Sequence, residues 1–278
     1  MNYDVLVVGS GPAGLAAAVA ARGRDKSVLV VGNPWQESPL ARAERIDNYL
    51  GLPGVNGREL MEHFSAHAQR VGVEFHTGRV VAVMAWEGFA LTAGSEVFQG
   101  RTLVLAPGVA RLAKYPGEAE LLGRGVSYCA TCDGMLYRGK PVAVVGYTDT
   151  ARQEAEFLQK IGCSVTYFDR PKQCEIRGDG RVESVTCDGR TIPAEGVFIL
   201  RPTMAPTELF PGLAVENGYV TVDRRMATNL PGVFAAGDCT GGPLQVSKAT
   251  GEGLVAGQSA AAYAAAIIRK EQAAKSSI

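Results

Sequence analysis

One pattern occurs twice in this chain of 278 residues: a Val-rich run, a turn that begins with Gly, a helical stretch and a second apolar run. The first copy covers residues 3–31 and the second covers residues 141–168. Apolar runs bounded by glycines and followed by a helical period are typical of parallel strands buried on both faces. The repeat therefore predicts an α/β fold with two Rossmann-like, three-layer dinucleotide-binding domains.

The segments outside the repeat fit the same class. Residues 58–71 have a helical pattern, and short alternating runs at residues 79–85, 88–92 and 102–105 predict a strand meander. The chain carries 28 basic and 28 acidic residues, which argues against a nucleic-acid partner or a basic membrane-binding tail. The apolar helix near the end is filled by Ala and interrupted by Gln258 and Ser259, so we expect no membrane span. We expect a cytoplasmic protein.

The first glycine turn has the spacing of a nucleotide-binding loop. Gly9 permits the tight turn, Gly11 lets a pyrophosphate approach the backbone, and Gly14 permits close contact between helix and strand. The positive end of the following helix favours the phosphate charge. The next strand ends without the usual acidic residue for the ribose hydroxyls, and Asn33 and Glu37 are both candidates for that role.

Cys129 and Cys132 are separated by two residues, a spacing that lets the two sulfurs meet and cycle between dithiol and disulfide. The same spacing suits zinc, but a structural zinc site needs four ligands. The sequence does not arrange Cys163, Cys174 and Cys187 as a second close pair, and the three histidines lie far away. We therefore expect a redox pair and no metal.

Four segments together resemble the low-molecular-weight thioredoxin reductases. They are Gly-Val-Ser-Tyr-Cys-Ala-Thr-Cys-Asp-Gly at residues 125–134, the loop at residues 46–53, the glycine segment at residues 232–238, and residues 103–108, where Pro107 replaces the family's Thr. The resemblance runs through nearly the whole chain. It implies a discontinuous FAD-binding domain made of residues 1–112 and 206–278, with an inserted NAD(P)H-like domain at residues 113–205 that carries the redox pair. It also implies a homodimer.

The resemblance assigns cofactor contacts to matching positions. In this family the glycine loop holds the FAD pyrophosphate, Asn48 faces the isoalloxazine, Asp238 bonds the ribityl chain, and the start of the last helix reaches the pyrimidine edge. One departure is Leu244 where the family has Arg. Besides Asn33 and Glu37, the expected FAD-binding positions are Gly9, Gly11, Pro12, Ala13, Gly14, Asn48, Gly108, Gly237, Asp238, Gln245 and Val246.

The resemblance also assigns the redox roles. Cys132 is the sulfur nearer the flavin, and Cys129 is the outer sulfur that attacks a substrate disulfide. Asp133 is the only ionisable side chain beside the pair and is the family's candidate acid, since the leaving sulfur needs a proton. Electrons would pass from a donor to FAD, then to the cysteine pair and then to a thioredoxin-like protein.

The second glycine turn departs from the family pattern. Thr148 stands where a Gly should admit a pyrophosphate, and Asp169 would repel the 2′-phosphate of NADPH. Arg170 and Lys172 are a poor substitute for the family's Arg cluster, and the middle of the chain is shorter than in the family. These features, with residues 241–252, resemble the ferredoxin-dependent flavin thioredoxin reductases, which have lost the pyridine-nucleotide site.

We therefore expect ferredoxin or a similar one-electron protein as the donor. Several further functions remain open from the sequence. Asp169 stands 23 residues after Gly146, about where a ribose-binding acid of an NADH enzyme belongs. The sequence also leaves open an NADPH-dependent reductase, a diflavin disulfide oxidoreductase, a dithiol oxidase that uses oxygen, and a flavin-bearing sensor without turnover.

Overall fold

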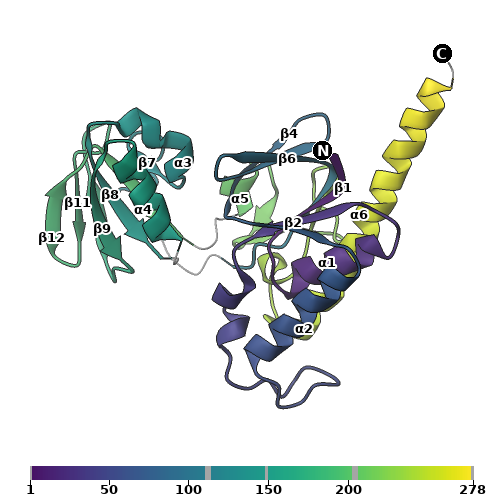
Figure 1. Cartoon of the computed structure of the whole chain (residues 1–278). Coiled ribbons are helices and arrows are strands. Elements are labelled where there is room, and N and C mark those ends of the chain that lie inside the picture. Colours follow the sequence, from purple (N-terminus) through teal and green to yellow (C-terminus); the bar gives the residue numbers. More distant parts are fainter. Residues whose placement is uncertain (1, 110–113, 148–149, 202–205, 277–278) are drawn as a thin grey trace. The chain divides into compact units, whose positions relative to one another are not determined.

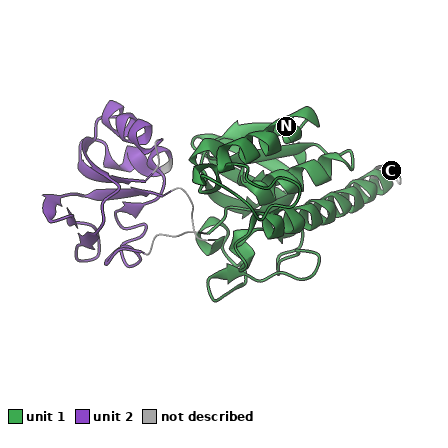
Figure 2. Cartoon of the chain, turned by 90° about the horizontal axis from the view of Figure 1, so that it is seen from below, with its two compact units in different colours: residues 1–109, 203–278 green, residues 110–202 purple. Residues whose placement is uncertain are grey.

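The computed structural model describes residues 2–109, 114–147, 150–201 and 206–276, apart from the side chains of Asn2, Cys132 and Lys275. The chain divides into two compact units: residues 1–109 with 203–278 form unit 1, and residues 110–202 form unit 2 (Figures 1 and 2). No helix among the described residues is long and apolar enough to cross a membrane.

Unit 1 is built on a sheet with the strand order β3-β2-β1-β6-β5-β4, in which β16 also pairs with β6. Strands β3, β2, β1, β6 and β16 run parallel, and β4 and β5 complete the sheet as an antiparallel meander. The strands are β1 (Asn2–Val8), β2 (Val28–Gly32), β3 (Glu74–Thr77), β4 (Val80–Ala85), β5 (Phe89–Ala93), β6 (Glu96–Leu105) and β16 (Val233–Ala235). A small separate sheet pairs β14 (Val215–Glu216) with β15 (Tyr219–Val220).

Three helices cover one face of this sheet: α1 (Pro12–Arg22), α2 (Gly57–Arg70) and α6 (Val246–Lys275) (Figure 1). Short helical turns connect the other elements of unit 1. They are η1 (Trp35–Glu37), η2 (Leu40–Arg42), α5 (Pro206–Leu209) and η4 (Asp238–Thr240).

The central strand β1 explains why the sequence forms this layered structure. Val5 and Val7 point into the core beneath α1 and α6, whereas Leu6 and Val8 point into the core beneath β4, β5 and α5. All four side chains are at most 3% exposed. A strand buried on both faces needs a continuous apolar run, as predicted for parallel strands. The predicted α/β fold is confirmed.

Unit 2 combines a parallel sheet of strand order β7-β13-β8-β9 with an antiparallel sheet of order β10-β11-β12. Its strands are β7 (Val126–Ser127), β8 (Pro141–Gly146), β9 (Ser164–Asp169), β10 (Cys174–Arg177), β11 (Ser184–Cys187), β12 (Arg190–Pro193) and β13 (Gly196–Leu200). Its helices are α3 (Ala130–Asp133), η3 (Gly134–Tyr137) and α4 (Ala151–Lys160). Alternate residues of β8 again fill two separate cores, one on each face.

A buried ion pair joins distant parts of unit 2. Arg201, at the end of β13, donates from Nη2 to Glu118 Oε2 over 2.7 Å, and the Glu118 side chain is fully buried. The Tyr128 hydroxyl donates to the other Glu118 oxygen, and the Tyr115 amide donates to the first. Burial alone would raise the pKa of Glu118, but these donors outweigh it and hold the pKa below its ordinary value. The carboxylate therefore ties the entry and the exit of unit 2 to the strand before Cys129.

The structure corrects the expectation about the remaining cysteines. Cys174 and Cys187 face each other across β10 and β11 and form a disulfide, although 13 residues separate them in sequence. Their side chains are 6% and 1% exposed. The sequence argument considered only close spacing along the chain and missed this bond, because the pairing depends on the register of two antiparallel strands. Cys163 and Cys239 are free and buried.

This disulfide is expected to stabilise unit 2 selectively. Closing a loop of this length restricts the unfolded chain by about 3 kcal/mol, so Cys174→Ala/Cys187→Ala should speed amide exchange in β10–β12. Hydrogen exchange with mass spectrometry measures that change. Trp35 and Trp86 both lie in unit 1, so urea unfolding followed by Trp fluorescence gives an internal control that should not move. Unchanged exchange in β10–β12 would contradict a stabilising role.

Candidate functional site

The first glycine turn joins β1 to α1 with no room for larger residues. Gly9 has a φ of +110°, and a Cβ atom there would lie 2.2 Å from the Ala106 carbonyl oxygen. A Cβ atom on Gly14 would lie 1.9 Å from the Gly9 carbonyl oxygen. Both glycines are thus required by the close approach of backbone segments, in agreement with the interpretation of the motif.

Gly11 has a different environment. A Cβ atom at this position would meet no atom within 4 Å, so the backbone here faces open space. Gly11 caps α1 without a side-chain hydrogen bond, and the first turn of α1, which begins with Pro12 and Ala13, holds no acidic residue. The helix end therefore keeps unsatisfied amides and a positive partial charge. This cradle fits the pyrophosphate of FAD.

Three further residues predicted to bind FAD lie after strands near the glycine loop: Asn33 and Glu37 follow β2, and Gly108 follows β6. Gly108, with a φ of +77°, also faces open space. Asn33 follows β2, and its carbonyl oxygen accepts a hydrogen bond of 2.6 Å from the Ser10 hydroxyl in the glycine turn. Glu37 ends η1. The contact places Asn33 beside the turn, and both ribose assignments stay predictions.

Two predicted flavin contacts from distant segments meet in the structure. The Asn48 side-chain amide donates to the Gln245 Oε1 atom over 2.5 Å, although 197 residues separate the two in sequence. Gln245 is the N-cap of α6, and Val246 is its first residue. The structure thus brings the loop at residues 46–53 to the start of the last helix, as an isoalloxazine site would require.

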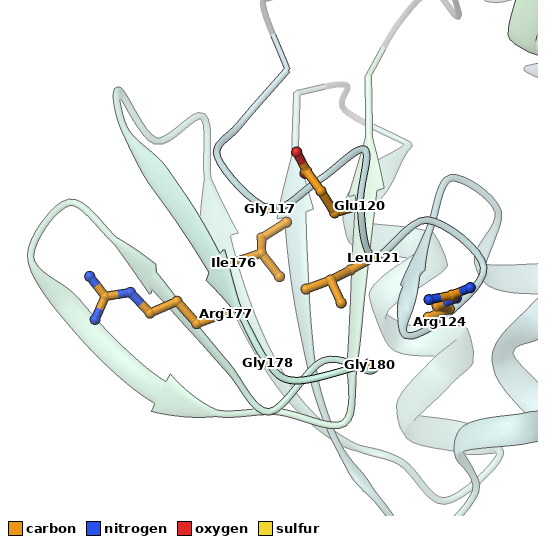
Figure 3. Close-up of a pocket in the computed structure, with 8 residues that line it drawn as sticks. All are labelled: Gly117, Glu120, Leu121, Arg124, Ile176, Arg177, Gly178 and Gly180. Carbon is orange, nitrogen blue, oxygen red and sulfur yellow. The ribbon is translucent and has the colours of Figure 1, made fainter.

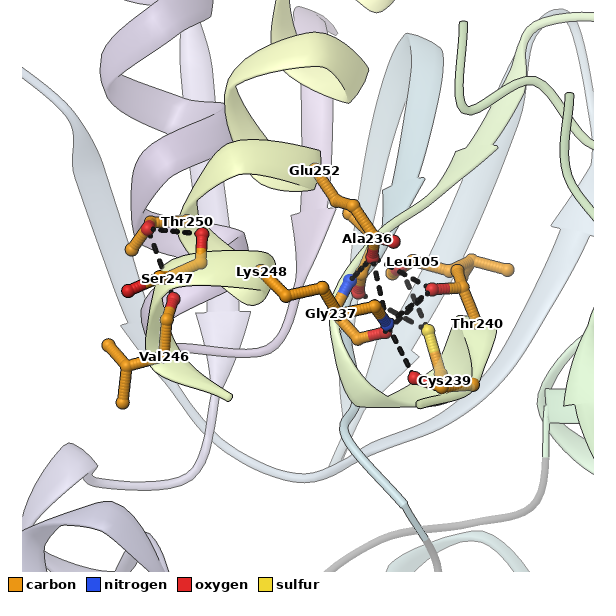
Figure 4. Close-up of polar contacts among 11 residues, drawn as sticks. Leu105, Ala236, Gly237, Cys239, Thr240, Val246, Ser247, Lys248, Thr250 and Glu252 are labelled. Carbon is orange, nitrogen blue, oxygen red and sulfur yellow. Dashed lines mark hydrogen bonds and ion pairs between the residues drawn. The ribbon is translucent and has the colours of Figure 1, made fainter. Parts of the chain in front are cut away.

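The glycine segment at residues 232–238, which the resemblance assigns to FAD binding, ends in the turn of residues 237–241. Gly237 has a φ of +86°, and Asp238 begins η4. Sequence reasoning assigned no role to Lys248 and Glu252 of α6, yet both bond this turn (Figure 4). Their signal was a Lys–Glu pair four residues apart at a helix start.

Cys239, the next residue along this turn, is a packed residue. It is 2% exposed, and its thiol donates to the Ala236 carbonyl oxygen over 3.3 Å. Burial raises the pKa of the thiol to about 12, so the thiolate needed for redox chemistry is disfavoured.

The redox segment lies in unit 2, between β7 and α3. Cys129 is 7% exposed and disulfide-bonded. Cys132 belongs to α3, and its side chain lies outside the described part of the structure. Thr131 Oγ1 lies 3.4 Å from the Cys129 sulfur.

Ser127 links Asp133 to this segment and was missed by sequence reasoning. Its hydroxyl donates to Asp133 Oδ2 over 2.7 Å and accepts from the Cys129 amide over 3.1 Å. The candidate acid is thereby held beside the backbone of Cys129. A serine two residues before the first cysteine is too common a feature to have indicated this contact.

The described start of the second glycine turn, Gly146 and Tyr147, packs against neighbouring side chains. A Cβ atom on Gly146 would lie 2.2 Å from the Tyr167 hydroxyl, so that ring packs directly on the turn. The Tyr147 hydroxyl contacts the Tyr115 hydroxyl and donates to the Pro171 carbonyl oxygen over 2.8 Å. Thr148, which replaces the Gly expected at the pyrophosphate position of this turn, lies outside the described residues.

The end of β9 and the loop after it are also held by hydrogen bonds within the protein. Asp169 accepts a hydrogen bond of 2.9 Å from Arg152, whose guanidinium lies over the Tyr167 ring. The Asp188 carboxylate accepts from the backbone amides of Lys172 and Gln173, each over 3.0 Å. The Asp169 and Asp188 carboxylates thus accept hydrogen bonds from a guanidinium and from two backbone amides at and after the end of β9.

A pocket of about 480 Å³ lies elsewhere in unit 2 (Figure 3). Arg124 and Arg177 contribute its basic side chains, and Arg177 is paired with Glu175 outside the pocket. None of the predicted site residues lines this pocket.

The chain matches known proteins over nearly its whole length. The family model of pyridine nucleotide-disulphide oxidoreductases matches residues 3–175 and 170–253. The thioredoxin reductase of Listeria innocua serovar 6a is 34% identical over 94% of this chain and 93% of its own.

Solved structures give the same result. A ferredoxin-flavin thioredoxin reductase from Clostridium acetobutylicum is 40% identical, with a TM-score of 0.86 over 94% of this chain and 97% of its own. A thioredoxin reductase from Gloeobacter violaceus is 31% identical, with a TM-score of 0.81 over 94% of this chain and 93% of its own. These matches confirm the two Rossmann-like domains and FAD as the cofactor. The chain belongs to the pyridine nucleotide-disulphide oxidoreductase family, as an oxidoreductase of the thioredoxin reductase type.

Proposed function

We propose that this protein reduces a thioredoxin-like protein disulfide with electrons that a ferredoxin-like one-electron carrier delivers to FAD. The observation that carries the proposal is the engagement of the groups after β9, where Asp188 accepts from the amides of Lys172 and Gln173 and Asp169 is paired with Arg152. The similarity to a protein named as a ferredoxin-flavin thioredoxin reductase supports it.

A nicotinamide dinucleotide must lay its pyrophosphate against the backbone of such a turn. In the sequence, Thr148 stands at the position where a Gly should admit the pyrophosphate, and a branched side chain there opposes that approach. Beside the turn, the Tyr167 ring packs close to Gly146 and lies under the guanidinium of Arg152. The same substitution opposes the binding of a second flavin there.

The charges beside the turn oppose NADPH as well. Recognition of a 2′-phosphate uses cationic side chains and backbone amides. Here Asp188 already accepts from two of the amides after β9, and Arg152 is paired with Asp169. Because Asp169 is already paired with Arg152, it is less able to accept hydrogen bonds from the ribose hydroxyls of NADH. This weakens the case for an NADH-dependent reductase.

The residues of unit 2 can carry out the disulfide exchange. FAD, when bound, supplies a two-electron store that can be filled one electron at a time. With the pair reduced, the Cys129 thiolate attacks the substrate disulfide, one substrate sulfur leaves, and Cys132 then displaces the second by attacking the mixed disulfide. Asp133, held by Ser127 beside Cys129, is placed to give a proton to a leaving sulfur.

Replacing the acid should slow this exchange without loss of the flavin. We expect Asp133→Asn to lower turnover of a thioredoxin disulfide about a hundredfold, because it removes the proton donor. Ser127→Ala should give a smaller decrease, since it removes only the hydroxyl that orients the carboxylate. Visible absorbance checks that FAD is retained. Full turnover of Asp133→Asn across the pH range would remove this residue from the mechanism.

An exposed apolar surface beside the redox segment suits a protein substrate. Met135 and Leu136 follow α3 directly and are 58% and 70% exposed. Exposed large apolar side chains next to a reacting group are typical of a protein-binding surface. A small disulfide would not need them.

Met135→Ser/Leu136→Ser should therefore raise KM for a thioredoxin-like substrate by about tenfold, through the loss of apolar contact. Turnover of a small aromatic disulfide should stay the same. Leu122→Ser is the matched control, because Leu122 is a large apolar side chain of the same unit that is 40% exposed. Equal losses with both substrates would argue against a docking role.

The donor is tested by anaerobic mixing of the oxidised protein with NADPH, with NADH or with a reduced bacterial ferredoxin. Flavin absorbance should bleach only with ferredoxin, and reduction of thioredoxin should follow. Rapid bleaching of the unchanged protein by either nucleotide, with none by ferredoxin, would overturn the proposal.

A further inference from the structure

Lys248 and Glu252 occupy the first two turns of α6, where helix energetics favour neither a Lys nor this order of the pair. Lys248 is the third residue of the helix, next to the positive end of the helix dipole, which favours anions. A Lys that precedes a Glu by four residues is also the weaker order for a helical ion pair. Contacts outside the helix must therefore explain the pair.

The Lys248 ammonium group bonds the turn at residues 237–241. It donates to the carbonyl oxygens of Gly237 over 2.8 Å and Gly241 over 2.5 Å, and to the Thr240 hydroxyl over 3.0 Å. The side chain is only 15% exposed. One charged group thus holds both ends of the turn (Figure 4).

Glu252 bonds the same turn. Its Oε2 atom accepts from the Gly237 amide over 2.9 Å and from the Thr240 hydroxyl over 2.8 Å, and it lies 3.1 Å from the Lys248 ammonium. Hydrogen bonds to charged groups are about twice as strong as those between neutral groups. We name Lys248 and Glu252 together the α6 clamp.

The turn held by the α6 clamp also packs against α1, whose first turn belongs to the glycine loop expected to bind the FAD pyrophosphate. A Cβ atom on Gly237 would lie 2.7 Å from the Ala13 Cβ atom in the first turn of α1. On α6, a Cβ atom on Gly253 would lie 2.2 Å from the Ala13 carbonyl oxygen. The turn, α6 and the start of α1 are therefore packed against each other at one place, with Asp238 in the turn.

We infer that Lys248 and Glu252 are positioning residues for FAD. The clamp fixes the turn at residues 237–241 so that Asp238 stands at a set distance from the glycine loop at residues 9–14. The inference rests on the proposed contact of Asp238 with the ribityl chain. It does not depend on the identity of the electron donor.

The test measures FAD binding to apoprotein, together with the flavin visible circular dichroism and reduction potential of the reconstituted protein. We expect Lys248→Met and Glu252→Gln each to weaken FAD binding about tenfold or more, since each removes charge-assisted hydrogen bonds. The visible circular dichroism should change, because a shift of the turn that carries Asp238 alters the protein environment of the flavin. Lys248→Met/Glu252→Met leaves no uncompensated charge and should show the same flavin effects with less loss of apoprotein stability.

Glu271→Gln is the matched control, because Glu271 lies on the same helix and pairs with Arg101 away from the turn. It should leave FAD affinity, spectrum and potential unchanged. Asp238→Ala tests the underlying assignment. If Asp238→Ala weakens FAD binding while all clamp variants bind FAD normally with an unchanged spectrum, the inference is overturned and the proposed site stands. No readout requires a donor, so this failure is distinct from a failure of the ferredoxin proposal.

Discussion

The close packing of α6 on α1 joins the two ends of the chain into unit 1. A Cβ atom on Gly253 or Gly257 would lie 2.2 Å or 2.1 Å from a carbonyl oxygen of α1, so only glycines permit the contact. The helices α1 and α6 come from segments more than 200 residues apart. Because both begin at expected flavin contacts, this packing brings the two halves of the FAD site together.

The same contact explains why charged residues are tolerated at the start of α6. With the helix held against α1, its first turns lie beside the turn at residues 237–241, and Lys248 and Glu252 can satisfy that turn's amide, hydroxyl and carbonyl groups. Polar backbone groups that are shielded from water require such partners. Lys248 and Glu252 thus supply the hydrogen bonds that water would otherwise make to this turn, which packing shields from solvent.

Unit 2 keeps the strand pattern of a dinucleotide-binding domain, and its own side chains pack closely around the described start of the second glycine turn. Tyr167 covers Gly146, and carboxylates of the loops take up the donors beside it. The buried carboxylate of Glu118 connects Arg201 with Tyr128, the residue before Cys129. These contacts join both ends of unit 2 to the segment that carries the redox pair.

The sequence by itself determined the α/β class, the glycine loop, the redox spacing and the family, because each depends on residues close together in the chain. Only the tertiary structure decided the Cys174–Cys187 disulfide, the Ser127–Asp133 contact and the packing of Tyr167 on Gly146. Strand register and side-chain direction set these contacts. Neither can be read from local spacing, since a shift of one residue between paired strands turns every side chain to the other face.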